Sequence, residues 1–172
     1  VVNHLQLRLA PRPRRAARRA AALFTSNTTN LRDFARCFRV DSDRLSDTGI
    51  QRVTALDEET RRASGRLRIV WSGRLEHRKA LHLLLEALHR MPPSVNFELC
   101  VLGRGPLEQR WKRLAERLGL NARCRWLGWL PHDQALAEFR RADVFAFTSL
   151  CDSMGTVVLE ALGAGLPVLC LD

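Results

Sequence analysis

The sequence predicts an α/β protein whose main domain is a doubly wound, parallel, Rossmann-like sheet. Two observations lead to this fold class. From Gly65 onward, short apolar runs alternate with amphipathic segments that place leucines on one helical face. Prolines and glycines stand at the borders of these segments, where helices begin and end. Strands that alternate with single helices are joined by crossovers, and they form a parallel sheet covered on both faces.

The chain changes character near residue 65, where this alternation begins. Before that point, "RLAPRPRRAARRA" carries six arginines and predicts a basic helix after Pro13. A solvated charged face is the simpler interpretation of this helix, because its other side is mostly alanine and buries little area; contact with an anionic surface or a partner domain is the alternative. The remainder predicts a strand and then a helix over 21–38, a turn over 41–50 and a polar connector over 56–65.

After Gly65, each predicted strand is a short apolar run and each predicted helix repeats apolar residues at helical spacing. Strands are expected at residues 67–73, 96–103, 123–129, 142–149 and 167–172. Helices are expected at residues 78–90, 106–118, after Pro131, and at 154–164. Leu81, Leu84, Leu85 and Leu88 share one face of the first of these helices, so that face is predicted to pack on the sheet.

The charge balance is strongly basic, at +10 from 28 basic and 18 acidic residues, and 26 of the basic residues are arginine. Arginine presents a planar fork of donors that suits phosphate, so polyanionic partners are expected: nucleotide diphosphates, anionic lipid surfaces or nucleic acid. Composition alone does not choose among them.

The five cysteines show neither a CxxC pair nor a metal-type clustering with the five histidines. Three of them lie in apolar strand-like runs, which favours reduced, buried thiols and a cytoplasmic protein. No apolar run approaches the ~18 residues of a membrane span, and the arginine-rich start lacks the apolar stretch of a secretory signal. His77, His82 and His89 fall on or beside one helix and are expected to face solvent or to cap helix ends.

Doubly wound sheets bind ligands at the carboxyl ends of their strands, so the residues after each strand are the first candidates for a site. "GRLEHRK" follows the first strand, and its Gly73, Arg74 and Lys79 combine close backbone approach with two cations that suit a pyrophosphate. "SLCDSMGT" follows the fourth strand and opens a helix, whose free amides at Gly155 and Thr156 attract phosphate. "GRGPLE" after the second strand is weak evidence for a dinucleotide site, because the third glycine is missing.

Two carboxylates stand out in the apolar segment "DSMGTVVLEALGAGLPVLC". Asp152 falls just before the predicted helix, and Glu160 lies about two turns into it. A buried carboxylate is costly unless hydrogen bonds satisfy it, and the hydroxyls of a ribose would do so. From spacing alone, a surface Glu160 on the polar side of the helix is an equally good interpretation.

Four segments follow one another in a definite order: "IVWSGRLEHRKALHLLLEAL", "GRGPLEQRWKRLAERLGL", "WLGWLPHDQALAEFRRADVFAFTS" and "DSMGTVVLEALGAGLPVL". Together they resemble the carboxy-terminal, donor-binding domain of the group 1 (family 4 type) retaining glycosyltransferases with the GT-B fold. The resemblance covers about residues 66–172. It implies that 1–62 is the end of an acceptor-side amino-terminal domain with a linker, and that 63–172 is the nucleotide-sugar-binding domain, incomplete at its carboxyl end. We therefore expect this chain to be a fragment.

The resemblance also implies roles for the candidate residues. Arg74 and Lys79 would hold the diphosphate and stabilise the leaving group, and Glu160 would take the ribose hydroxyls. The family has two glutamates separated by seven residues. Here Asp152 stands at the first of these positions, which keeps the charge but shortens the side chain. The resemblance implies a role for Asp152 at the donor sugar. The "WLGWL" loop occupies the base-side position, so main-chain groups near Trp129 and Leu130 would face the nucleobase, with the Trp129 side chain interpreted as structural.

The predicted function is transfer of a glycosyl group from a nucleotide-diphosphate sugar to an acceptor. The resemblance implies that the reaction proceeds with retention and without a metal or cofactor. The acceptor would be a sugar, a lipid-linked molecule or a small molecule, and the protein would be cytoplasmic, with peripheral contact to a membrane left open and nucleic acid not expected. The alternative from a different class is a non-catalytic basic module that binds anions or nucleic acid, which the +10 charge and the arginine-rich start suggest.

Overall fold

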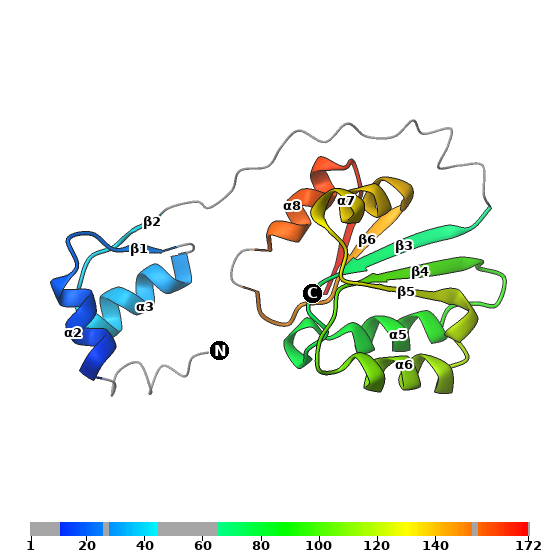
Figure 1. The fold of residues 1–172 in the computed structure, drawn as a ribbon, viewed down its shortest axis with the longest axis horizontal. Helices are drawn as coiled ribbons and strands as arrows, with labels where there is room; N and C mark the ends of the chain where they lie inside the picture. Colours follow the sequence, from blue (N-terminus) through cyan, green and yellow to red (C-terminus); the bar gives the residue numbers. More distant parts are fainter. Residues whose placement is uncertain (1–10, 26–27, 45–64, 153–154, 172) are drawn as a thin grey trace. The chain divides into compact units, whose positions relative to one another are not determined.

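The computed structural model describes residues 11–25, 28–44, 65–152 and 155–171, and it divides into two compact units, Val1–Gly49 and Ile50–Asp172 (Figure 1). The domain boundary that we predicted between residues 62 and 63, and nearly all of the polar connector, lie outside the described residues.

The first unit contains two short helices and two very short strands. Helix α2 (Pro11–Arg19) is the expected basic helix, although it begins at Pro11 and not after Pro13. The strand β1 (Phe24–Thr25) and the helix α3 (Thr28–Phe38) are the expected strand and helix. The predicted turn over 41–50 was wrong at its start, because β2 (Asp43–Arg44) pairs in parallel with β1 through its backbone, with the Asp43 amide donating to the Leu23 carbonyl at 2.9 Å. Ala17 is the buried centre of a small core with Leu23, Phe34 and Val40.

The second unit is the predicted doubly wound sheet. Its five parallel strands stand in the order β5-β4-β3-β6-β7, and the helices lie on both faces, with α5 and α6 on one and α7 and α8 on the other (Figure 1). Every predicted strand and helix after Gly65 is present. The strands are β3 (Leu67–Ser72), β4 (Phe97–Leu102), β5 (Cys124–Gly128), β6 (Val144–Phe147) and β7 (Val168–Cys170). The helices are α5 (Leu81–His89), α6 (Glu108–Arg117), α7 (His132–Arg141) and α8 (Thr156–Gly163), with 3₁₀ turns η1 (His77–Lys79) and η2 (Asn121–Arg123).

The core has one layer on each face of the sheet, because alternate residues of a strand point to opposite faces. Ile69 and Trp71 of β3 join the layer under α5 and α6, whereas Val70 joins the layer under α7 and α8. All four predicted leucines of α5 are buried in the first layer. A central strand that is buried on both sides is apolar throughout, as "IVW" is here.

One predicted helix is interrupted. The stretch that we expected to be helical from Arg78 is split into η1 and α5 by Ala80, which is fully buried and has φ 47° and ψ 37°, in the left-handed region. Its neighbour Lys79 is held by the residue that follows the adjacent strand β6, because the Thr148 hydroxyl donates to the Lys79 carbonyl at 2.7 Å. This long-range hydrogen bond accompanies a backbone conformation that alanine disfavours, and helical periodicity gave no sign of it.

The burial of each cysteine on a strand depends on where that strand lies in the sheet. Cys100 on the interior strand β4 is buried, and burial beside Glu138 raises the pKa of its thiol to about 12. Cys124 is half-buried, and burial raises its pKa to about 11. The expectation of burial was wrong for Cys170, which is exposed on β7, a strand that pairs only with β6 among the described residues.

Candidate functional site

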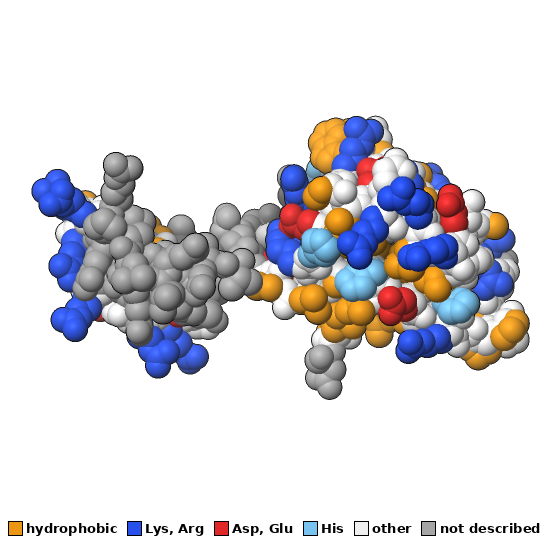
Figure 2. Space-filling view, turned by 90° about the horizontal axis from the view of Figure 1, so that it is seen from below, with side chains coloured by type: hydrophobic (Ala, Val, Ile, Leu, Met, Phe, Trp, Pro, Cys, Tyr) orange, Lys and Arg blue, Asp and Glu red, His pale blue; other side chains and the backbone are white. Residues whose placement is uncertain are grey.

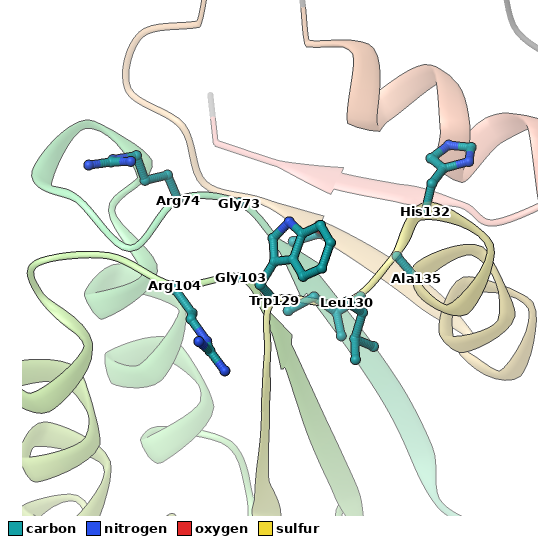
Figure 3. Close-up of a pocket in the computed structure, with 10 residues that line it drawn as sticks. Gly73, Arg74, Gly103, Arg104, Trp129, Leu130, His132 and Ala135 are labelled. Carbon is teal, nitrogen blue, oxygen red and sulfur yellow. The ribbon is translucent and has the colours of Figure 1, made fainter.

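The loops that follow β3, β4 and β5 meet at the carboxyl edge of the sheet and form a pocket of about 700 Å³ (Figure 3). Three predicted site residues, Gly73, Arg74 and Leu130, lie in its lining. The full lining is Ser72, Gly73, Arg74, Leu102, Gly103, Arg104, Trp129, Leu130, His132 and Ala135.

Backbone packing between glycines forms one side of this pocket. The Gly73 amide donates to the Leu102 carbonyl at 3.0 Å, and the Gly103 amide donates to the Gly128 carbonyl at 2.6 Å. Gly103 has φ +116°, and a Cβ placed on it would lie 2.0 Å from the Gly73 carbonyl oxygen. The three loops therefore approach each other as closely as backbone allows, and glycine is required where they meet.

Two arginines occupy the same position in successive loops, directly after the glycine that follows each strand. Arg74 follows Gly73, and its exposed guanidinium pairs with Glu76 at 3.4 Å and extends away from Trp129 (Figure 3). Arg104 follows Gly103, and its guanidinium lies against Gly128. We did not assign a role to Arg104 from the sequence, although its equivalence to Arg74 in "GR" after a strand was the signal that could have found it.

Lys79 and Asp152 form an ion pair between the loops that follow β3 and β6. Both side chains are largely buried, at 11% and 18% exposure. The ammonium also lies 5.9 Å from the centre of the Phe147 ring, and the Ser149 hydroxyl donates to Asp152 at 3.4 Å. The structure thus brings together two residues for which the resemblance implies separate roles, one at the diphosphate and one at the sugar. They meet between β3 and β6, where the strand order reverses and such sheets bind ligands.

A buried hydrogen-bond chain fixes the backbone beside Lys79. The Trp71 indole donates from Nε1 to the Thr148 hydroxyl at 3.0 Å, and that hydroxyl donates to the Lys79 carbonyl. Buried polar groups that are fully satisfied in this way make a local geometry rigid. The base of the Lys79 side chain is therefore held by the sheet itself.

The helix predicted to begin near Met154 has its first residue at Thr156, with Gly155 at the N-cap in the left-handed region, at φ 58°. Helix starts leave backbone amides without intrahelical acceptors, which is the property that suits them to phosphate. Ser153 and Met154 lie outside the described residues.

Glu160 lies on α8 and is half-buried, with its side chain 31% exposed. Its Oε1 is 3.4 Å from Nε2 of His132, a residue at the start of α7 that also lines the pocket. Neither interpretation of Glu160 from the sequence included this neighbour. The two residues come from different helices, α7 and α8, which lie on the same face of the sheet.

The structural interpretation of Trp129 was wrong. The side chain is 67% exposed and lines the pocket instead of filling a core, and Figure 3 shows its indole between the loops that carry Arg74 and Arg104 and the start of α7. Leu130, the next residue, is half-buried and packs against the core layer under α7 and α8. Exposed indoles beside a pocket are suited to stacking on flat ligands.

The histidines beside α5 differ in their surroundings. His77 is exposed, and Nδ1 of His89 lies 2.9 Å from the Leu118 carbonyl at the end of α6, as expected of a capping residue. The prediction was wrong for His82, which is half-buried and stacks on Trp111 with ring centres 6.3 Å apart. Figure 2 shows basic, histidine and apolar side chains interspersed on the face of the second unit that it displays.

Among the described residues, neither a metal centre nor a membrane-spanning helix is present. No group of three or more His, Cys, Asp or Glu side chains there is placed to hold a metal ion. In the same part of the chain, no helix combines the length and the apolar character needed to cross a bilayer.

Comparison with known sequences identifies relatives along most of the chain. Residues 53–172 match the family described as "Glycosyl transferases group 1". The chain is 34% identical over 122 residues to the lipopolysaccharide core biosynthesis glycosyltransferase LpsE of Rhizobium meliloti, covering 70% of this chain and 34% of that protein. It is 29% identical over 169 residues to the D-inositol 3-phosphate glycosyltransferase of Corynebacterium efficiens, covering 87% and 40%. The chain thus spans less than half the length of these relatives.

Comparison with solved structures gives the same fold. WaaG, a glycosyltransferase involved in lipopolysaccharide biosynthesis, matches with a TM-score of 0.76 at 24% identity, over 95% of this chain and 50% of that chain. Anabaena HepE, solved in complex with UDP and glucose, matches with a TM-score of 0.69 at 20% identity, over 98% and 48%. These neighbours show a GT-B fold. The family match over residues 53–172 establishes that the chain belongs to the group 1 glycosyltransferases.

Proposed function

We propose that the protein transfers a glycosyl group from a nucleotide-diphosphate sugar to an acceptor, and that the pocket at the carboxyl edge of the sheet binds the nucleoside diphosphate. The observation that carries this proposal is the pocket itself, which combines glycine backbone, two arginines and an exposed indole in a member of this family. Support comes from HepE, whose structures were solved with UDP and with UDP-glucose.

The cations at this edge would bind the diphosphate. Arg74 and Arg104 line the pocket, and Lys79 lies further along the loop that carries Arg74. When the bond between the anomeric carbon and the phosphate oxygen breaks, its electron pair stays on the diphosphate. Fixed positive charge at that position stabilises the transition state more than the ground state, which is the usual origin of large electrostatic rate effects.

Binding of the diphosphate would rearrange the ion pairs at this edge of the sheet. Arg74 is paired with Glu76, and Lys79 is paired with Asp152. Phosphate oxygens would replace the carboxylates as partners of both cations, and Asp152 would then be available to hydroxyl groups of the donor sugar. Backbone amides of Gly155 and Thr156 would supply further donors to the phosphates.

The nucleoside would occupy the other side of the pocket. Glu160 would accept hydrogen bonds from the ribose hydroxyls, main-chain groups at Leu130 would meet the edge of the base, and the exposed Trp129 indole would stack on its face. Gly73 would let the backbone approach the phosphates closely.

Retention at the anomeric carbon, independence of metal and cofactor, and assignment to family 4 are part of the proposal because the ordered motifs resemble that family. The positive charge that a metal would supply has substitutes in Arg74, Arg104, Lys79 and the start of α8. We propose a cytoplasmic protein whose acceptor is a sugar, a lipid-linked molecule or a small molecule, with peripheral membrane contact if the acceptor is lipid-linked.

The test is calorimetric titration of the intact protein with UDP, GDP and ADP at two salt concentrations. We expect one diphosphate to bind selectively, and Arg74→Ala and Glu160→Ala to weaken it at least tenfold, because hydrogen bonds to charged groups contribute about 1.5–3 kcal/mol each. Arg113→Ala is the matched control, since Arg113 is an exposed arginine on α6. Equal, weak binding of all three that collapses with salt would instead favour a non-catalytic anion-binding module.

A further inference from the structure

His132 connects the pocket to Glu160. It is the first residue of α7, it lines the pocket, and its Nε2 lies 3.4 Å from Oε1 of Glu160 on α8. Figure 3 shows the imidazole on the opposite side of Trp129 from Arg74. His132 therefore stands at the end of the pocket away from Arg74, and the proposed function places the nucleoside at this end.

Two carboxylates lie near the His132 imidazole, and Glu160 is the closer of them. Asp133 is the other carboxylate near the ring, with Oδ1 3.8 Å from Nδ1, and its side chain is fully exposed. The contact at 3.4 Å joins His132 Nε2 to one oxygen of Glu160, and a carboxylate has further acceptor positions that remain open to a ligand. His132 can thus hold Glu160 in place while the Glu160 carboxylate still accepts hydrogen bonds from a ligand.

A glutamate side chain needs such a neighbour to be an accurate ligand. Glu160 has several rotatable bonds and is partly exposed, so without a partner its carboxylate samples several rotamers. Recognition of a diol requires one carboxylate orientation, because both hydroxyls must reach it together. The start of α7 is fixed by backbone hydrogen bonds from Gln134 and Ala135 to the Pro131 carbonyl, so His132 is attached to a rigid element.

We propose that His132 is a positioning residue, which holds the Glu160 carboxylate in the orientation that recognises the ribose hydroxyls of the donor. This inference rests on the proposed function of the pocket and extends it to a residue outside the predicted site. It predicts that loss of His132 removes discrimination between ribose and deoxyribose and leaves phosphate binding intact.

The experiment compares dissociation constants for three probes on the intact protein. The probes are the tightest-binding diphosphate among UDP, GDP and ADP, its 2′-deoxy analogue, and inorganic pyrophosphate. Hydrogen bonds to a charged acceptor contribute about 1.5–3 kcal/mol, so we expect the parent protein to prefer the ribose form about 10- to 100-fold. His132→Ala is expected to reduce this preference to about threefold or less while pyrophosphate affinity stays unchanged.

Two further variants make the result specific. His132→Gln is expected to restore most of the preference, because the glutamine amide nitrogen lies near the position of Nε2 and donates a hydrogen bond. Asp133→Ala is the control beside it on the same helix turn and is expected to behave like the parent.

Different failures have different meanings. If Glu160→Ala abolishes the ribose preference but His132→Ala keeps it, the positioning role is overturned and the assignment of Glu160 stands. If Glu160→Ala keeps the preference, the ribose assignment in the proposed function fails, and the role of His132 fails with it. If His132→Ala weakens all three probes by the same factor, His132 acts on the phosphates or on the whole pocket, and the inference is wrong.

Discussion

Gly103→Ala is expected to destabilise the second unit much more than Gly119→Ala, although both replace a glycine with positive φ. Gly119 has φ +71°, and a Cβ there would meet nothing within 4 Å. Gly103 has φ +116°, and a Cβ there would lie 2.0 Å from the Gly73 carbonyl oxygen. The first substitution thus imposes backbone strain alone, whereas the second adds a collision between two loops of the site.

The magnitudes follow from these two terms. Left-handed backbone costs an L residue about 1–2 kcal/mol, which is the loss expected for Gly119→Ala. Forcing an extra methyl group into packed structure adds about 1–3 kcal/mol, so the loss expected for Gly103→Ala is about 2–5 kcal/mol. Because the Gly73 backbone must move, diphosphate affinity should fall as well, and it should stay unchanged in Gly119→Ala.

The assay is urea unfolding followed by fluorescence. The free energies of unfolding are compared with one common slope of free energy against urea concentration. Circular dichroism of each variant before titration shows whether the sheet is retained. Equal losses in the two variants, or a Gly103→Ala protein that binds diphosphate like the parent, would refute the close approach of these loops.

Three other perturbations test separate parts of the structure. Trp129→Ala is expected to weaken the binding of the nucleoside diphosphate about 5- to 100-fold, because base stacking is lost. Pyrophosphate binding and stability in urea are expected to stay unchanged. A loss of stability would instead support a structural role for Trp129. Asp152→Asn is expected to destabilise the protein by about 1–3 kcal/mol, because it leaves the largely buried ammonium of Lys79 without its carboxylate. Adding Lys79→Met to the same chain is expected to recover part of that loss. If the two losses of stability are simply additive in urea titrations, the ion pair does not contribute. Burial raises the pKa of the Cys100 thiol to about 12, so at pH 8 less of this thiol is thiolate than in the unfolded chain. Mass spectrometry is expected to find Cys100 alkylated more than tenfold more slowly than the exposed Cys151 in the folded protein, and at an equal rate in urea. Equal alkylation rates in the folded protein would contradict the burial of Cys100.

Most of the sheet could be predicted because the signals are local. "LRIVWSG" and "NFELCVLG" are short apolar runs between turn residues, and β3 and β4 begin and end within a residue of these segments. The strand β2 could not be predicted, because Asp43 and Arg44 have no apolar pattern and are extended only through pairing with β1. Local sequence encodes an element when the element's own side chains specify it, and it does not when a distant backbone does.

The candidate site shows the same division. Glycines and cations after strands could be found from the sequence, since the carboxyl ends of parallel strands share one edge. The pairing of Lys79 with Asp152 could not, because 73 positions separate the two residues. The contact of His132 with Glu160 and the exposure of Trp129 likewise depend on how the helices and loops pack, which periodicity does not specify.

The place of β3 in the sheet has a consequence for the order of folding. β3 pairs with β4 through residues that are close in sequence, such as Leu67 with Phe97, but it pairs with β6 across a far longer loop, with 75 positions between the hydrogen-bonded Arg68 and Asp143. Closing the longer loop costs more entropy, so the half-sheet of β3, β4 and β5 is expected to form before β6 docks. The contact between Lys79 and Asp152 lies across that late junction. A ligand held there would therefore stabilise the last step of folding, and hydrogen exchange along β6 would report its binding more sensitively than exchange along β4.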